Sequence, residues 1–144
     1  MAKRSIIFIC THNSSRSQMA EGLMRHHYGM RYNVFSAGTQ PGGVNPFAVE
    51  AMKAIDIDIS DHTSDNVDDF DPSTIDFAVT VCDSARDECP YFPARQMTVH
   101  HSFSDPSAVT GERAVKLAAF VEVRDQIEHW LTSEFVPSIE STDV

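Results

Sequence analysis

A cysteine, an arginine and a serine stand at fixed spacing near the start of the chain, where a short apolar run gives way to a helical pattern. The run Ser5–Ile9 predicts a buried strand, and Cys10 follows it directly. A six-residue loop that ends at Arg16 comes next, and Ser17 then opens a predicted helix that extends to Tyr28. A loop that ends on a helix N-terminus directs backbone N–H groups and the positive end of the helix dipole at one point. The pattern predicts an anion-binding loop with a cysteine at its base.

The chemistry that this loop predicts is attack by sulfur on a phosphate-like anion. Arg16 contributes a planar fork of N–H donors that suits a tetrahedral oxyanion. The same positive field favours the thiolate of Cys10, and the thiolate is the nucleophilic form of cysteine. Ser17 is the candidate to hydrogen-bond this thiolate, although a serine at a helix start also serves as a cap. The expected oxyanion-binding residues are consecutive: Thr11, His12, Asn13, Ser14, Ser15 and Arg16.

The composition is that of an ordinary globular protein with one domain. The chain has 144 residues, of which 42% are hydrophobic and 22% charged, so that it can bury a substantial core. Its formal net charge of −10 disfavours nucleic acid and anionic membranes as partners. The apolar run at the N-terminus is too short for a signal peptide, and no run is long enough to span a membrane. Three cysteines without a secretion signal predict a protein of the reducing cytoplasm.

Strand and helix patterns alternate along the chain, which predicts an α/β fold with a parallel sheet and helices on both faces. Cys10 and Cys82 each follow a predicted strand, so both are expected at the carboxyl edge of the sheet. Residues 1–132 are expected to form the catalytic domain, and residues 133–144 a flexible acidic tail. The other predicted strands are Tyr32–Ser36, Phe77–Val81 and Gln96–Val99, and the other predicted helices are Pro46–Ala54, Thr63–Asp69 and Gly111–Leu131.

Several motifs together resemble one known family. Cys-x5-Arg-Ser resembles the active-site loop of the low-molecular-weight protein tyrosine phosphatases and of the thioredoxin-coupled arsenate reductases built on the same fold. The further motifs that resemble the reductases are Ser17–Gly22, Ser36–Gly38, Val44–Pro46, Asp58–Asp65, Cys82, Cys89-Pro90 and Asp105-Pro106. Their order and spacing extend over residues 5 to about 130, which makes the resemblance specific. It implies a single domain with a four-stranded parallel sheet and the activity of a thioredoxin-dependent arsenate reductase, which serves arsenic detoxification.

The resemblance implies a role for each of the three cysteines. Cys10 would attack arsenate while Asp105 protonates the leaving oxygen. Cys82 would then form a disulfide with Cys10 and expel arsenite, because two thiols supply the two electrons of the reduction. Cys89 would move the disulfide outward to Cys82–Cys89, where thioredoxin reduces it. A helical Cys82–Cys89 segment would hold its end Cα atoms ~10 Å apart, too far for a disulfide, so we expect the segment to change conformation on oxidation.

The resemblance also leads to expectations about cofactors, and the sequence departs from the family pattern at two positions. No tightly bound cofactor is expected, and the protein is expected to be a monomer. His12 stands where the family usually has glycine, and Ser15 stands where many members have a further cysteine. The residues that match potassium ligands of some similar reductases are Asn13, Glu21, Ser36 and Asp65.

Two other functions remain open at the level of sequence. A tyrosine phosphatase of this family usually has proline where Gln18 stands, and an aromatic residue where Ser107 stands. A non-enzymatic oxyanion or thiol redox sensor would need a partner surface that the sequence does not display. A zinc site formed by Cys82, Cys89 and the His100-His101 pair is a weaker alternative, because these residues lack compact ligand spacing.

Overall fold

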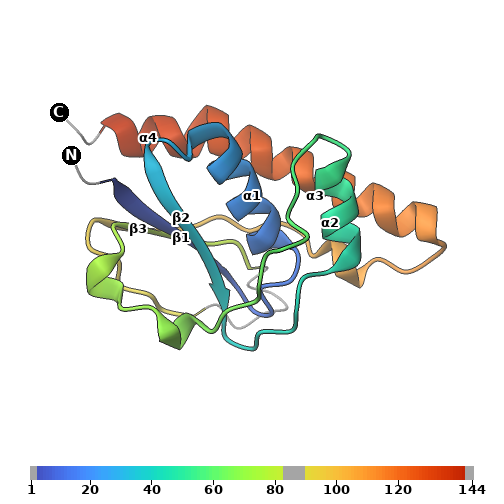
Figure 1. Ribbon diagram of the computed structural model, residues 1–144, viewed down its shortest axis with the longest axis horizontal. Helices are drawn as coiled ribbons and strands as arrows, with labels where there is room; N and C mark the ends of the chain where they lie inside the picture. Colours follow the sequence, from blue (N-terminus) through green and yellow to red (C-terminus); the bar gives the residue numbers. More distant parts are fainter. Residues whose placement is uncertain (1–2, 83–89, 142–144) are drawn as a thin grey trace.

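The computed structural model describes residues 3–82 and 90–141, which fold around one parallel sheet (Figure 1). The strands are β1 (Arg4–Cys10), β2 (Tyr32–Gly38), β3 (Phe77–Thr80) and β4 (Met97–His100). Their spatial order is β2-β1-β3-β4, and every neighbouring pair is parallel. This confirms the predicted four-stranded sheet, and it brings the ends of β1 and β3 to the same edge.

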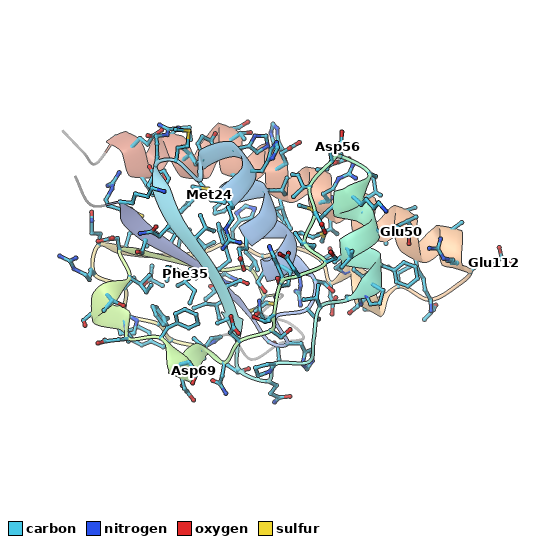
Figure 2. All side chains as sticks on the ribbon, viewed as in Figure 1. Met24, Phe35, Glu50, Asp56, Asp69 and Glu112 are labelled. Atoms are coloured by element: carbon cyan, nitrogen blue, oxygen red, sulfur yellow. The ribbon has the colours of Figure 1, made fainter. Side chains whose placement is uncertain are left out.

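The α-helices lie together on one face of the sheet (Figure 1). They are α1 (Arg16–Tyr28), α2 (Pro46–Lys53), α3 (Arg113–Trp130) and α4 (Val136–Glu140). Figure 2 shows their side chains packed against the sheet, with Met24 buried and the charged Asp69 and Glu112 at the periphery. In α2, Pro46 occupies the first turn and the Asn45 side chain caps the helix by accepting from the Phe47 N–H at 2.8 Å.

The opposite face of the sheet has a different cover. Two short 3₁₀ helices lie on this side, η1 (Val67–Asp69) and η2 (Pro72–Thr74). Within the described ranges this face packs against Val67 of η1, against Phe70 and Ile75 on either side of η2, and against Phe92. The helix predicted over residues 63–69 is therefore only the turn η1. A third 3₁₀ helix, η3 (Pro106–Ala108), follows β4. No helix in the described part of the chain is long and apolar enough to cross a membrane.

The C-terminal segment is helical, so the prediction of a flexible tail from residue 133 is wrong for the residues up to Glu140. A π-helical turn, η4 (Leu131–Phe135), joins α3 to α4. The Phe135 ring stacks on Trp130 at 5.1 Å between centroids. Pro137 is accommodated in the first turn of α4, where its missing N–H costs least. The buried residues follow a helical spacing, and their burial outweighs the polar composition: Leu131, Phe135, Val136 and Ile139.

Candidate active site

The loop between β1 and α1 carries the candidate nucleophile. Cys10 is the last residue of β1, and it is a free cysteine with 3% of its surface exposed. Asn13 adopts the left-handed conformation, with a φ of 49°. Its carbonyl oxygen accepts hydrogen bonds from Gln18 Nε2 at 3.0 Å and from Ser64 Oγ at 2.6 Å. These bonds hold the loop in its curved form above the N-terminus of α1.

The end of β2 packs closely against this loop. A Cβ atom on Gly38 would lie only 2.5 Å from the Thr11 carbonyl oxygen, so a side chain at this position would displace the loop. His12 has no positive φ, and its ring Nδ1 lies 3.1 Å from the Gln40 carbonyl oxygen. The replacement of the family's usual glycine by His12 is therefore compatible with the loop backbone.

Ser17 is positioned to donate its proton to the sulfur of Cys10. The two side chains are 2.9 Å apart, measured from Ser17 Oγ to Cys10 Sγ. Asn13 Oδ1 accepts from the backbone N–H of Asp65 at 2.9 Å, which leaves Asn13 Nδ2 to donate to Ser17 Oγ at 2.8 Å. Because Ser17 Oγ already accepts that bond, its own hydrogen is available to Cys10. The arrangement stabilises negative charge on the sulfur.

Arg16 and Asp105 meet beside the loop, although 89 positions separate them in sequence. Arg16 is 4% exposed, and it donates to the Phe103 carbonyl oxygen at 3.2 Å. Its guanidinium lies 3.7 Å from Asp105 Oδ2. The other oxygen, Asp105 Oδ1, accepts from the N–H of Ser107 at 2.9 Å and from its hydroxyl at 2.7 Å. The candidate acid thus turns one oxygen towards the arginine for which the sequence predicts anion binding.

A second thiol lies at the same edge of the sheet. Cys82 is fully buried two residues beyond β3, and its Sγ lies 3.7 Å from the Ile9 carbonyl oxygen. The same carbonyl accepts the Val81 N–H at 2.9 Å, which continues the pairing of β3 with β1. Ile9 directly precedes Cys10, and both cysteines belong to the same buried cluster. Cys89, and with it the expected conformational change of its segment, lies outside the described residues.

Two hydroxyl groups of the loop are buried without a hydrogen-bond partner in the described structure: Thr11 Oγ1 and Ser15 Oγ. Leaving a buried polar group unsatisfied costs about 1–3 kcal/mol. Both residues belong to the six-residue stretch for which the sequence predicts oxyanion binding.

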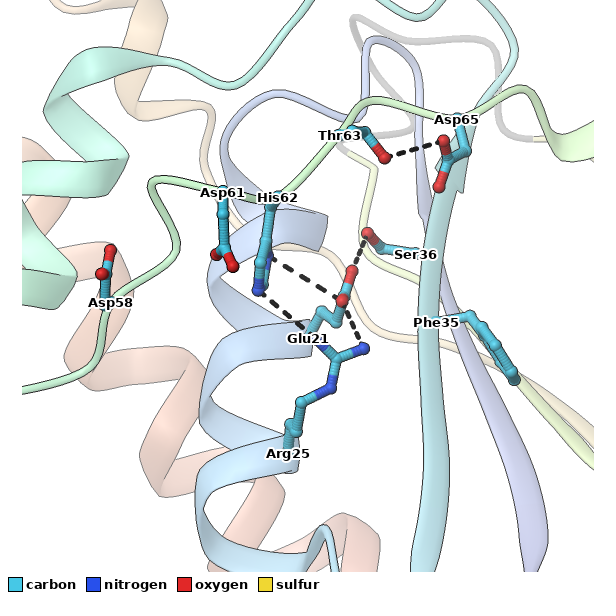
Figure 3. Close-up of a pocket in the computed structure, with 9 residues that line it drawn as sticks. All are labelled: Glu21, Arg25, Phe35, Ser36, Asp58, Asp61, His62, Thr63 and Asp65. Carbon is cyan, nitrogen blue, oxygen red and sulfur yellow. Dashed lines mark hydrogen bonds and ion pairs between the residues drawn. The ribbon is translucent and has the colours of Figure 1, made fainter.

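A hydrogen-bond network leads from the candidate nucleophile to a polar cavity of about 490 Å³, and Figure 3 shows the side chains that line this cavity. Asn13 Nδ2 also donates to Ser36 Oγ at 2.9 Å, and Ser36 Oγ donates to Glu21 Oε1 at 2.5 Å. Arg25 lies 2.6 Å from the other oxygen, Glu21 Oε2. His62 Nδ1 lies 3.9 Å from that same oxygen. The cavity is therefore connected to Cys10 through side chains of α1 and β2.

The sequence and structure comparisons identify the family. Residues 5–140 match the family model described as low molecular weight phosphotyrosine protein phosphatase. The chain belongs to this family. An arsenate reductase from Halalkalibacterium halodurans is 47% identical over 127 residues, which cover 88% of this chain and 91% of that protein. An arsenate reductase from Bacillus licheniformis is 45% identical with the same coverage. These relatives place the chain in the arsenate reductase branch of the family.

Solved structures of this branch have the same fold. An arsenate reductase in the phosphate binding state aligns with a TM-score of 0.75 at 29% identity, over 88% of this chain and 92% of that one. An arsenate reductase in the oxidized state aligns with a TM-score of 0.72 and the same identity and coverage.

The four residues that match potassium ligands in some members of the family come together, but their contacts do not suit a potassium ion beside Arg25. Ser36 donates to one oxygen of Glu21, and the positive guanidinium of Arg25 lies 2.6 Å from the other, where its charge opposes that of a second cation. Asn13 Oδ1 accepts from the Asp65 N–H. Potassium binding remains a prediction, and no step of the chemistry below depends on it.

The zinc alternative includes Cys89, which lies outside the described residues, and its two histidines have other contacts. Thr80 Oγ1 and His100 Nδ1 form a hydrogen bond of 2.7 Å. The His101 ring stacks on Trp130 at 4.6 Å between centroids. Burial lowers the pKa of His101, and the nearby Glu134 opposes this effect in part. Among residues 3–82 and 90–141, no group of three or more metal-ligating side chains could hold a metal ion.

Three contributors to this site were missed by the sequence analysis. Gln18 Nε2 donates to the carbonyls of Asn13 and Thr63, so its Oε1 must accept from His62 Nδ1, 3.0 Å away. Arg25 belongs to the same network, because its guanidinium contacts both Glu21 and His62. Both Gln18 and His62 belong to motifs that carry the family resemblance, which was an available signal. Arg25 lies four residues after Glu21, a spacing that brings opposite charges together on a helix.

Proposed function

We propose that this protein reduces arsenate to arsenite by a relay of its three cysteines, with thioredoxin as the electron donor. The observation that carries the proposal is the buried thiol of Cys82, 3.7 Å from the carbonyl oxygen of the residue that precedes Cys10. A phosphatase needs one thiolate, an arginine and an acid, whereas a reductase needs a second thiol near the first. The 45–47% identity to proteins named arsenate reductase supports the same conclusion.

The first step is attack of the Cys10 thiolate on arsenate. A sulfur–arsenic bond forms, the bond from arsenic to a hydroxyl group of hydrogen arsenate breaks, and this hydroxyl leaves as water after Asp105 supplies a proton. Arg16 and the N–H groups of the loop compensate the negative charge of the oxyanion. Ser17 supports the attacking thiolate through its contact of 2.9 Å with the sulfur.

The second step transfers two electrons to arsenic. The Cys82 thiolate attacks Cys10 Sγ, a sulfur–sulfur bond forms, and the electron pair of the sulfur–arsenic bond leaves with arsenic as arsenite. Ile9 pairs with Thr80, so Cys82 lies one residue past the position opposite Cys10. A strand spacing of about 4.8 Å and an offset of about 3.3 Å along the strand give a separation of about 6 Å, within the Cα range that a disulfide requires. The position of Cys82 just beyond β3, the strand next to β1, therefore favours this step.

The third step regenerates the nucleophile. Cys89 attacks Cys82, which releases Cys10 as a thiolate and leaves a Cys82–Cys89 disulfide. A dithiol of the thioredoxin class then reduces this disulfide by thiol–disulfide exchange. Such a cycle requires a reducing compartment, and we assign the protein to the cytoplasm on this ground.

The test is arsenite production with thioredoxin, thioredoxin reductase and NADPH. We expect sustained turnover for the unmodified protein, about one arsenite per molecule for Cys89→Ser, and none for Cys10→Ser. Equal sustained rates for the unmodified protein and Cys89→Ser would remove Cys89 from the relay.

Phosphatase activity is the second candidate, because Cys10, Arg16 and Asp105 form the set that phosphate monoester hydrolysis needs. It is tested by adding an aryl phosphate to the unmodified protein and to Cys82→Ser. Hydrolysis that survives in Cys82→Ser, together with loss of arsenite formation, assigns reduction to the second thiol. Rapid hydrolysis without any arsenite formation by the unmodified protein would establish the phosphatase instead.

A further inference from the structure

We propose that Arg25 is a positioning residue of the Cys10 site, where its guanidinium supplies the positive charge that a bound potassium ion would otherwise supply at Glu21. The inference rests on the proposed function only in taking Cys10 as the nucleophile. It makes the site independent of added monovalent cations.

The carboxylate of Glu21 needs a positive partner in the fold. Glu21 is only 8% exposed, and a buried carboxylate is costly unless it is paired and hydrogen-bonded. The cavity beside it is lined by three further acids, Asp58, Asp61 and Asp65, which add negative charge (Figure 3). Arg25 is the lining residue that carries a fixed positive charge, and its terminal nitrogen lies 2.6 Å from Glu21 Oε2.

Arg25 is held in place by more than this ion pair. The same terminal nitrogen donates to the Val34 carbonyl oxygen of β2 at 2.6 Å. Its other terminal nitrogen lies 3.4 Å from His62 Nε2. Because His62 Nδ1 donates to Gln18, Nε2 of the neutral ring is an acceptor for Arg25. The guanidinium therefore joins α1, β2 and the loop that carries His62.

The charge at Glu21 reaches Cys10 through a chain of hydrogen bonds with defined directions. The Ser36 hydroxyl donates to Glu21, so its oxygen lone pairs face Asn13. The Asn13 amide then donates one N–H to Ser36 and the other to Ser17. Ser17 in turn donates to Cys10 Sγ. An uncompensated charge on Glu21 would disfavour a second negative charge on Cys10 at the other end of this chain.

The experiment compares Arg25→Met with Arg25→Lys, in a Cys82→Ser, Cys89→Ser background where Cys10 is the only thiol. The alkylation rate of Cys10 and the melting temperature are measured in KCl, NaCl and choline chloride at equal ionic strength. The matched control is Arg31→Met, which removes an exposed arginine paired with Glu140, away from the cavity.

We expect the Arg25-containing protein to give the same alkylation rate and melting temperature in all three salts. Arg25→Met should alkylate about tenfold more slowly in choline chloride, the order of magnitude by which one charge changes the ionisation of a neighbour. KCl should restore part of this rate and raise the melting temperature more than NaCl does. Arg25→Lys should retain most of the rate, and Arg31→Met should match the parent protein.

Three results would overturn the inference. One is a saturable rise in melting temperature with KCl, but not NaCl, while Arg25 is present. Another is an alkylation rate for Arg25→Met equal to that of its parent. The third is a slow rate for Arg25→Met that is identical in all three salts, which would make Arg25 a packing residue. If Arg25→Met does not fold, the salt response of the parent protein still tests the inference, because a potassium-specific rise in its melting temperature would contradict it. Failure of the proposed function would appear as absent arsenite formation and would leave these measurements unaffected.

Discussion

Replacement of Ser17 by alanine should weaken the nucleophile without removing it. In the structure Ser17 Oγ lies 2.9 Å from Cys10 Sγ and accepts a hydrogen bond from Asn13 Nδ2 at 2.8 Å. Ser17→Ala removes the donor to the sulfur. It also leaves an Asn13 N–H without a partner in a fully buried environment. The substitution should therefore affect both the reactivity of Cys10 and the stability of the fold.

The two effects have separate magnitudes. A hydrogen bond to a charged group contributes about 1.5–3 kcal/mol. Since about 1.4 kcal/mol corresponds to a factor of ten, the alkylation rate of Cys10 should fall about 10- to 100-fold. The unsatisfied N–H should lower the free energy of unfolding by about 1–3 kcal/mol.

The assay is alkylation of Cys10 in the background that lacks the other two thiols, in the pH range where the logarithm of the rate still rises linearly with pH. Chemical denaturation of the same proteins gives the stability. Ser138→Ala is the control, because the Ser138 hydroxyl donates to the nearby Phe135 carbonyl in the C-terminal helix, away from the Cys10 loop. An unchanged alkylation rate in Ser17→Ala would refute the assignment of Ser17 as donor to the sulfur.

Three further substitutions test other parts of the structure. Asp105→Asn should slow arsenite formation about 10²- to 10⁴-fold through loss of the proton donor, and an unchanged rate would exclude Asp105 as the acid. The pKa of His101 is lowered in the fold by burial, so the unfolded chain takes up a proton more readily and stability falls as the pH drops below about 6.5. Between pH 7 and pH 5, His101→Phe should therefore lose less unfolding free energy than the unmodified protein. An equal loss in the two proteins would contradict this expectation. Phe135→Ala should lower the unfolding free energy by about 3–5 kcal/mol, because its ring packs on Trp130 and Phe8, whereas a change below about 1 kcal/mol would contradict that packing.

The local patterns of the sequence predicted the sheet and the loop well. Apolar runs such as Ser5–Ile9 fix buried strands, and strand–helix alternation fixes their parallel direction. The structure extends β1 to Arg4 and Cys10, a difference at the ends only. The proximity of Cys82 to β1 also follows from the strand pattern. Cys82 comes just after β3, and the parallel strands β1 and β3 end at the same edge of the sheet.

In the C-terminal segment, the composition indicates a flexible tail, whereas the periodicity of the apolar residues indicates a helix. Pro137 and the acids Glu134 and Glu140 suggested a tail. Leu131, Phe135 and Ile139 nevertheless recur every four residues and continue the buried stripe of α3. The apolar area that this stripe buries offsets the unfavourable residues.

The contacts around the cavity could not be predicted from sequence. Asn13, Gln18 and His62 have ordinary alternative roles as turn, helix or surface residues, and nothing in their spacing specifies the partner of each polar atom. The partners follow from long-range packing, since the loop containing His62 lies against α1 only in the folded chain.

The central claim is that the sulfur of Cys82 reaches the sulfur of Cys10 during arsenate reduction. The most direct test is one turnover of Cys89→Ser with arsenate and without reductant, followed by mass spectrometry of the digested protein. We expect a Cys10–Cys82 disulfide in amounts equal to the arsenite released. Arsenite formed while Cys10 and Cys82 both remain open to alkylation after denaturation would contradict it.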